Sequence, residues 1–93
     1  MKKIIYPAIF KKEEVGYSVR FPDLSGCNTE GDNLEEAYEM AFDALGLYLE
    51  TLGECPLPTC NISSLEKDEM LALIEFDIMK YRAKHSTKSV KKL

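Results

Sequence analysis

The sequence has few of the residues that usually perform catalysis or bind metals. Its 93 residues include no tryptophan, three cysteines and one histidine, His85. An odd and small number of cysteines argues against a disulfide scaffold. Cys55, Cys60 and His85 could supply zinc ligands, but the sequence lacks the second close cysteine pair of a zinc ribbon. We therefore expect neither a bound metal nor a cofactor.

Glycine-rich loops and long apolar runs are also missing. The five glycines are scattered singly, which excludes a glycine-rich phosphate-binding loop. No apolar run approaches the ~20 residues of a transmembrane helix. The apolar segment 4–10 ends at Lys11 and Lys12, with no small-residue cleavage site. We therefore expect a cytoplasmic protein whose first segment is a strand and not a signal peptide.

The potential catalytic groups lack the neighbours that they would need. His85 lies in a basic segment, away from the apolar pattern that builds a pocket, and Cys27 is surrounded by carboxylates that oppose a lowered thiol pKa. Four acids could in principle gather around magnesium: Asp23, Glu30, Asp32 and Asp43. The first predicted strand has no acid, however, and a two-metal nuclease needs carboxylates there. We expect no enzyme activity.

The sequence does contain an uneven distribution of charge. Residues 1–60 carry five Lys and Arg against eleven Asp and Glu, whereas residues 61–93 carry seven against five. From Lys80 to Leu93 there are six basic residues and no acidic one. The acidic part favours a basic partner, and the basic tail favours an acidic partner such as nucleic acid. From charge alone, a solvated surface followed by a soluble tail is the simpler explanation.

The apolar pattern of the first third predicts three short antiparallel strands. Residues 3–11 are apolar on both faces, as in a strand that is central or covered on both sides. Residues 17–21 alternate apolar and polar side chains. Residues 22–26 have the composition of a turn, and residues 27–31 predict a third strand.

The next segment predicts a long amphipathic helix that ends at Gly53. Its apolar residues recur at spacings of three and four and form one stripe: Leu34, Ala37, Tyr38, Ala41, Leu45, Tyr48 and Leu52. Either Asp32 or Asn33 can cap its start, since each has a glutamate three residues later.

Residues 69–77 form a second apolar run, whose period does not separate a strand from a helix. A helix of this composition would be apolar nearly all round, so we predict a fourth strand. A helical turn over residues 78–84 and a mobile tail follow. The predicted fold class is α+β, in the order β-β-β-α-β, with an antiparallel sheet and one long helix on a face.

Residues 6–50 resemble the N-terminal domain of HicB antitoxins. The family pattern has Y-P-A in the first strand, G-Y-x-V-x-F-P-D-x-x-G-C over the second strand and turn, and T-x-G-D/T-L-E-E-A at the helix start. This chain has YPA, GYSVRFPDLSGC and TEGDNLEEA in the same order. Ser25 replaces a common proline and Asn28 a usually apolar residue. Such an ordered series of matches is much more specific than one short motif.

The resemblance implies a partial ribonuclease H-like fold without the nuclease carboxylates. It also implies a partner, a HicA-type toxin that is small and basic and cleaves messenger RNA using a histidine. Residues 1–84 would form the toxin-binding domain of an antitoxin that covers the toxin's active site. Such antitoxins form dimers or tetramers and can co-repress their own operon.

We predict that the acidic strand turn and helix start form the toxin-binding surface, together with exposed acids of the helix. The residues selected are Tyr17, Arg20, Asp23, Leu24, Glu30 and Asp32. Their carboxylates would neutralise the basic RNA-binding face of the toxin and exclude its RNA. The expected mechanism is therefore occlusion.

We expect residues 85–93 to form a basic tail that resembles the linker to a C-terminal ribbon-helix-helix domain; either the protein lacks that domain or its sequence continues beyond Leu93. Four lysines would give at most weak, salt-sensitive contacts to phosphates: Lys84, Lys88, Lys91 and Lys92. Operator DNA is expected as a partner only through a domain beyond Leu93. The alternative function is a standalone transcriptional regulator that binds DNA as a dimer through such an extension.

Overall fold

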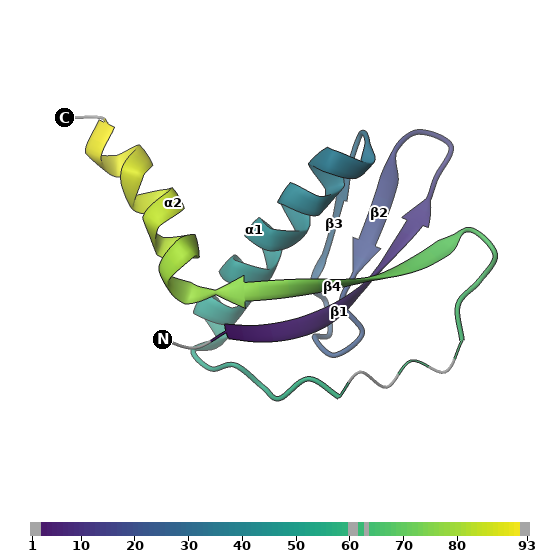
Figure 1. Cartoon of the computed structure of the whole chain (residues 1–93), viewed down its shortest axis with the longest axis horizontal. Helices are drawn as coiled ribbons and strands as arrows, with labels where there is room; N and C mark the ends of the chain where they lie inside the picture. Colours follow the sequence, from purple (N-terminus) through teal and green to yellow (C-terminus); the bar gives the residue numbers. More distant parts are fainter. Residues whose placement is uncertain (1–2, 60–61, 63, 92–93) are drawn as a thin grey trace.

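In the computed structural model of this chain, the described residues form four antiparallel strands and two helices (Figure 1). The structure describes residues 3–59, 62 and 64–91, with side chains as far as His85. The elements are β1 (Lys3–Lys12), β2 (Tyr17–Arg20), β3 (Asn28–Gly31), α1 (Leu34–Leu52), β4 (Glu69–Asp77) and α2 (Ile78–Lys91). The predicted α+β class and the order of its first five elements are confirmed.

The strand order in the sheet is β3-β2-β1-β4, which makes β1 a central strand, in agreement with its apolar residues on both faces. β1 pairs with β2 over a short stretch, in which Ile9 lies opposite Arg20. It pairs with β4 along the whole of β4, from Lys3 opposite Asp77 to Lys11 opposite Glu69. β3 and β4 are therefore the two edges of the sheet.

The core lies between α1 and one face of the sheet. Alanines at two successive turns of α1, Ala37 and Ala41, are completely buried and let the helix approach the strands closely. Leu45, one turn later, is also completely buried. Burying one such leucine contributes about 1.5–3 kcal/mol to the stability of the fold. The predicted apolar stripe of the helix therefore faces the sheet as expected.

Both ends of α1 have the caps that the sequence predicts. Asn33 is the N-cap, and its side-chain oxygen accepts a hydrogen bond from the backbone N–H of Glu36 at 2.8 Å. The Glu36 carboxylate in turn accepts from the backbone N–H of Asp32 at 2.6 Å. Asn33, and not Asp32, is thus the capping side chain. At the other end, Gly53 has a φ of 80°, the left-handed conformation that ends helices.

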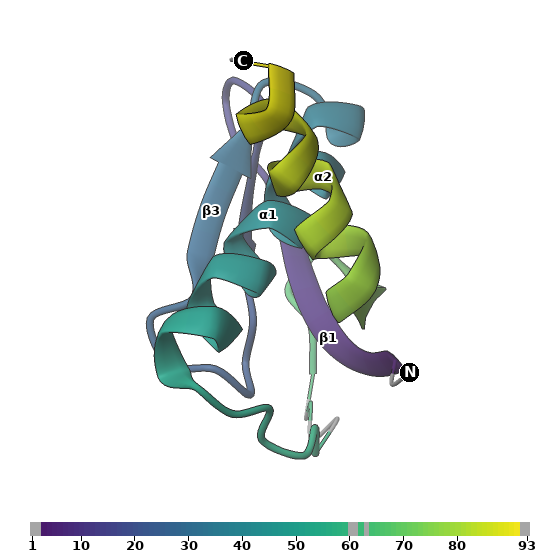
Figure 2. The same ribbon diagram turned by 90° about the vertical axis from the view of Figure 1, so that its left-hand side faces the viewer.

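The C-terminal segment differs from the prediction. Instead of a helical turn followed by a mobile tail, α2 continues to Lys91. The carboxylate of Asp77 supports the start of α2, because it accepts from the backbone N–H groups of Met79 and Lys80 at 3.0 and 3.2 Å. Tyr81 anchors the helix, since its ring is buried against α1 and β4. In the view of Figure 2, α2 crosses in front of α1.

The connection between α1 and β4 is attached to the sheet through polar contacts. The hydroxyl of Tyr6 donates a hydrogen bond to the carbonyl of Pro56. Burial, together with the nearby Cys55 and Asp23, raises the pKa of Tyr6 to about 12, so this hydroxyl keeps its proton.

Among the residues that the structure describes, no helix is long and apolar enough to cross a membrane.

Candidate functional site

Acidic side chains gather where β3 ends and α1 begins. A hollow of about 300 Å³ at this point is lined only by polar and acidic residues: Asp32, Asn33, Glu35, Glu36 and Glu39. Its four carboxylate residues are all exposed, and none of the lysines or arginines that the structure describes lines it. Glu30 in β3 is exposed near the same end of the sheet. We call this group, Glu30 with the residues of the hollow, the acidic surface.

A glycine brings the two halves of the acidic surface together. A side chain at Gly31 would overlap the backbone of Ala37, so only glycine lets β3 pass so close to the first turn of α1. This close approach places the end of β3, which carries Glu30, beside the first turn of α1, which carries Glu35. The acids also have a structural role, because negative charge in the first turn is stabilised by the helix dipole. Charge alone therefore does not make this surface a binding site.

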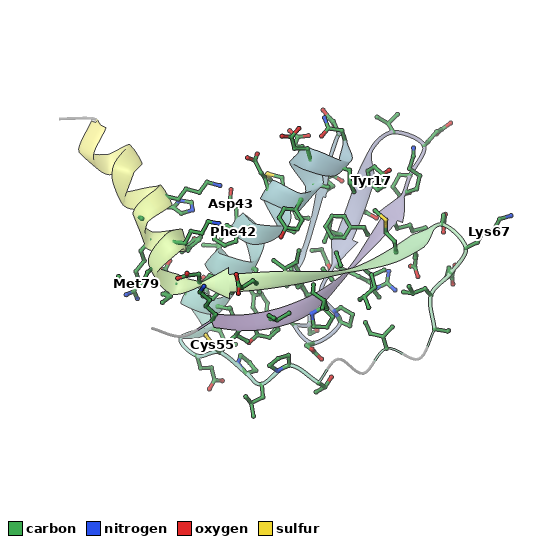
Figure 3. The ribbon with its side chains drawn as sticks, viewed as in Figure 1. Tyr17, Phe42, Asp43, Cys55, Lys67 and Met79 are labelled. Atoms are coloured by element: carbon green, nitrogen blue, oxygen red, sulfur yellow. The ribbon has the colours of Figure 1, made fainter. Side chains whose placement is uncertain are left out.

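Three of the six residues selected from the sequence lie at this end of the sheet. Tyr17 is opposite Gly31 in the β2–β3 ladder, and Ser18 is opposite Glu30. Asp32 directly follows this pair of strands. Tyr17, which is labelled in Figure 3, is half-buried. The ammonium of Lys12 lies 5.5 Å from its ring centre. Tyr17, Glu30 and Asp32 are therefore neighbours in the fold.

Arg20 lies further along β2 and has a structural contact. Because Val19 faces the core, the neighbouring Arg20 faces the other side of the sheet. Its guanidinium donates a hydrogen bond to Glu69 in β4 at 2.8 Å. This hydrogen bond, with one from the backbone N–H of Glu66, lowers the pKa of the Glu69 carboxyl. Arg20 thus connects β2 to β4 across the central strand.

Asp23 and Leu24 are also separate from the acidic surface. The carboxylate of Asp23 accepts hydrogen bonds from the backbone N–H and the hydroxyl of Thr59, at 3.1 and 2.5 Å. It thereby connects the turn after β2 to the segment that follows α1. Leu24 belongs to the core, with only 2% of its surface exposed. Its side chain is therefore not accessible to a partner in this structure.

His85 and Cys27, the two groups considered for catalysis, each lie among residues that belong to the fold. The ring of His85 packs against Tyr81, and its Nε2 is 3.7 Å from the carboxylate of Asp43. Burial raises the pKa of Cys27 to about 11, so this thiol stays protonated. Cys60, considered with Cys55 as a zinc ligand, lies outside the described residues. Within residues 3–59, 62 and 64–91, no three His, Cys, Asp or Glu side chains are placed to hold a metal.

Of the lysines selected for phosphate contact, Lys84 binds the carboxylate of Asp43 at 2.9 Å. Figure 3 shows Asp43 on the side of α1 that faces α2. Lys92 lies outside the described residues, as do the side chains of Lys88 and Lys91. The sequence pattern indicates the exposed acids of the helix only as a group. Glu35, Glu36 and Glu39 follow the N-cap by two to six residues, and this spacing is the signal that could have identified them as neighbours of Asp32.

Comparisons with known proteins agree with the fold and with the sequence motifs. A family model described as HicB-like antitoxin of bacterial toxin-antitoxin systems matches residues 6–90. Antitoxin HicB 2 of Photorhabdus laumondii is 42% identical over 62 residues, which cover 62% of this chain and 45% of that protein. The chain thus spans less than half the length of this curated relative.

Two solved structures resemble the chain. The crystal structure of antitoxin HicB3 has a TM-score of 0.65 and 27% identity, over 84% of this chain and 65% of that one. A chain of the HicA3 and HicB3 toxin-antitoxin complex has a TM-score of 0.60 and 26% identity, over 80% and 99%. The family match covers most of the sequence and both structures share its fold. This chain therefore belongs to the HicB-like antitoxin family.

Proposed function

We propose that this chain is an antitoxin that binds a HicA-type toxin and neutralises it by covering its active site. Family membership and the likeness to a chain of the HicA3 and HicB3 complex support a toxin as partner. The observation that carries the proposal is the acidic surface, whose hollow contains four carboxylates and no basic side chain among its lining residues. A partner that binds RNA presents lysine and arginine to the phosphates. The carboxylates therefore match such a surface.

Occlusion follows from this complementarity. When carboxylates occupy the basic groups of the toxin, the phosphates of messenger RNA lose their binding partners. Complementary charge also accelerates encounter, to as much as 10⁸–10⁹ M⁻¹s⁻¹ at low salt against about 10⁵–10⁶ M⁻¹s⁻¹ without steering. The proposed role needs no chemistry from the antitoxin itself, and we propose a non-enzymatic function. Oligomerisation, contact with operator DNA and a cytoplasmic location stay predictions.

Charge reversal tests the proposed surface. The variant Glu30→Lys/Glu35→Lys changes two exposed acids of the acidic surface. The matched control Glu50→Lys/Glu54→Lys makes the same change in charge near the C-terminal end of α1, where both acids are exposed. Toxin binding is measured by titration calorimetry with purified HicA-type toxin, and folding by circular dichroism. We expect the first variant to bind at least about tenfold more weakly and the control to bind nearly as the wild type does.

Two outcomes would contradict the proposal in different ways. No binding of the toxin by the wild-type chain would exclude the antitoxin function. Equal loss of affinity in both variants would exclude the acidic surface as the specific contact, because net charge alone would then explain the effect. Co-expression with the toxin gives a second readout, in which the wild-type chain restores growth.

A further inference from the structure

Side chains of α2 hold this helix against α1. The ring of Tyr81 packs over Gly46, and the ammonium of Lys84 lies 2.9 Å from the carboxylate of Asp43. His85 follows Lys84 and is the last residue of α2 whose side chain the structure describes. Its ring packs against that of Tyr81, with centroids 4.4 Å apart. Asp43 points toward α2 in Figure 3, and the charged contacts of α2 with α1 beyond Tyr81 meet at this carboxylate.

The Nε2 atom of His85 lies buried at this contact. Among the described residues it has no hydrogen-bond partner, although such buried polar atoms nearly always have one. Its distance to Oδ1 of Asp43 is 3.7 Å, which is too long for a hydrogen bond. A protonated imidazole carries an N–H on both ring nitrogens, so Nε2 can then donate to the carboxylate. The contact therefore has a place for one more ion pair, which a proton on His85 would complete.

Charged groups of both helices lie around His85. The described ones near this contact are Glu39, Asp43 and Glu50 of α1, and Lys80, Tyr81 and Lys84 of α2. Burial first, and then the nearby Glu50 and Asp43, raise the pKa of Tyr81, so its hydroxyl stays neutral. Glu50 lines a separate hollow with Arg82, nearer the start of α2. The charge on His85 is thus attracted chiefly by Asp43 and repelled by Lys84.

The acids prevail in this balance. A groove of about 550 Å³ opens between α1, α2 and the end of β4. Three acids and two lysines line it: Glu39, Glu75, Asp77, Lys80 and Lys84. Asp43 adds a fourth acid beside Lys84, so the described acids around this part of α2 outnumber the lysines. Such surroundings attract a proton to His85.

The size of the effect is limited by solvent. The side chains of His85 and Asp43 are 38% and 32% exposed, so water screens their attraction. Lys84 also competes for the same carboxylate. Ion pairs of this kind change an equilibrium by about two- to fivefold. A change of this size suffices to alter how often α2 leaves α1.

We propose that protonation of His85 strengthens the packing of α2 against α1 through an ion pair with Asp43, which makes the position of α2 responsive to pH. Histidine gains its proton between about pH 8 and pH 5. The packing therefore strengthens as pH falls through this range and weakens as pH rises. Because Lys80, Ala83 and Lys84 form the α2 wall of the groove, the same change steadies that wall. This inference concerns α2 alone and does not require that the toxin be the partner.

Hydrogen exchange of the α2 amides, followed by NMR between about pH 7.5 and pH 5.5 without toxin, tests this inference. The sequence has one histidine, so a change in this range points to His85. After correction for the intrinsic exchange rate, we expect the protection of residues 81–84 to rise about two- to fivefold toward lower pH. His85→Gln and Asp43→Asn should abolish the rise. The matched control Glu50→Gln removes the same charge two turns along α1 and should keep it.

Several outcomes would overturn the inference. Protection that does not change with pH in the wild type contradicts it, as does a rise that persists in His85→Gln. If Asp43→Asn releases α2 at every pH because Lys84 loses its partner too, Lys84→Gln decides, since it leaves His85 and Asp43 in place. Without the competing cation, the rise should exceed that of the wild type. An equal or smaller rise would assign the contact to Lys84 and exclude the proposed role of His85.

Discussion

Gly46 lies directly beneath the aromatic ring of Tyr81, and this contact joins α2 to α1. A Cβ atom at Gly46 would overlap the ring. The Tyr81 ring also contacts those of Phe42 and Phe76, with centroids 6.1 and 5.9 Å away, and only 6% of Tyr81 is exposed. Glycine within a helix costs about 0.5–1 kcal/mol relative to alanine. The chain therefore gives up helix stability at this position and gains a site for the tyrosine.

The substitution Gly46→Ala should change the sign of its effect with the residue at position 81. In the wild type we expect destabilisation of about 1–3 kcal/mol, because the added methyl group displaces the Tyr81 ring. In a Tyr81→Ala background the same substitution should stabilise by up to about 1 kcal/mol, because alanine favours the helix. Urea unfolding of the four proteins of this cycle measures both values. Effects of equal sign in both backgrounds would show that the ring does not rest on Gly46.

The helix cap provides a second prediction. Asn33→Ala should lower the free energy of unfolding by about 0.5–2 kcal/mol, because the side-chain oxygen that accepts from the Glu36 N–H is lost. Asp32→Ala should cost less, because Asp32 contributes its backbone N–H to the capping interaction. Chemical denaturation of both variants compares the two costs. A larger loss for Asp32→Ala would instead assign the cap to Asp32.

The Arg20–Glu69 pair predicts a dependence of stability on pH. The folded chain lowers the pKa of Glu69, chiefly through the hydrogen bond from Arg20. The pair therefore stabilises the fold fully above the ordinary carboxyl pKa, and the stabilisation is lost as pH falls through the lowered pKa. Arg20→Ala should lower the urea midpoint at neutral pH, and its difference from wild type should shrink in acid.

The control for this pH series is Arg82→Ala, which removes an exposed arginine of α2. Its difference from the wild type should not follow the titration of Glu69. A constant difference between Arg20→Ala and the wild type from neutral pH to acid would contradict the assigned role of the pair.

Thiol reactivity distinguishes two cysteines. Cys27 is buried and has a pKa of about 11, whereas Cys55 is exposed. In a Cys60→Ser background, the native protein should react rapidly with a thiol reagent at Cys55 only, since the thiolate is the reactive form. Both thiols should react after denaturation. Mass spectrometry after brief labelling identifies the modified residue, and rapid native labelling of Cys27 would contradict its burial in the core.

The sequence predicts the elements whose signals are local. The strand at 69–77 and the helix that ends at Gly53 agree with the structure, because apolar period and caps depend on neighbouring residues. The extent of α2 could not be predicted in this way. Its anchor, Tyr81, packs against Gly46, which is distant in the sequence, and the helix itself is strongly basic.

The candidate site can be predicted only in part from the sequence, because it also depends on contacts between segments that are distant in the chain. Neighbours in sequence point in different directions in a strand and a turn, so Asp23 and Leu24 do not share a surface with Glu30, whereas Arg20 faces the same side of the sheet as Glu30 but is bound elsewhere. Arg20 binds Glu69, Asp23 binds Thr59, and Leu24 is buried. The helix acids instead complete the acidic surface, because Gly31 allows β3 and α1 to meet. That contact depends on the tertiary fold and leaves no periodic pattern in the sequence.

Cleavage of messenger RNA by a purified HicA-type toxin, measured with increasing amounts of this chain, tests the proposed occlusion most directly. We expect cleavage to stop once the chain is equimolar with the toxin. With Glu30→Lys/Glu35→Lys, we expect inhibition to require about tenfold more protein, whereas Glu50→Lys/Glu54→Lys should inhibit as the wild type does. Continued cleavage at a saturating concentration of the wild-type chain would contradict the account, whether or not a complex forms.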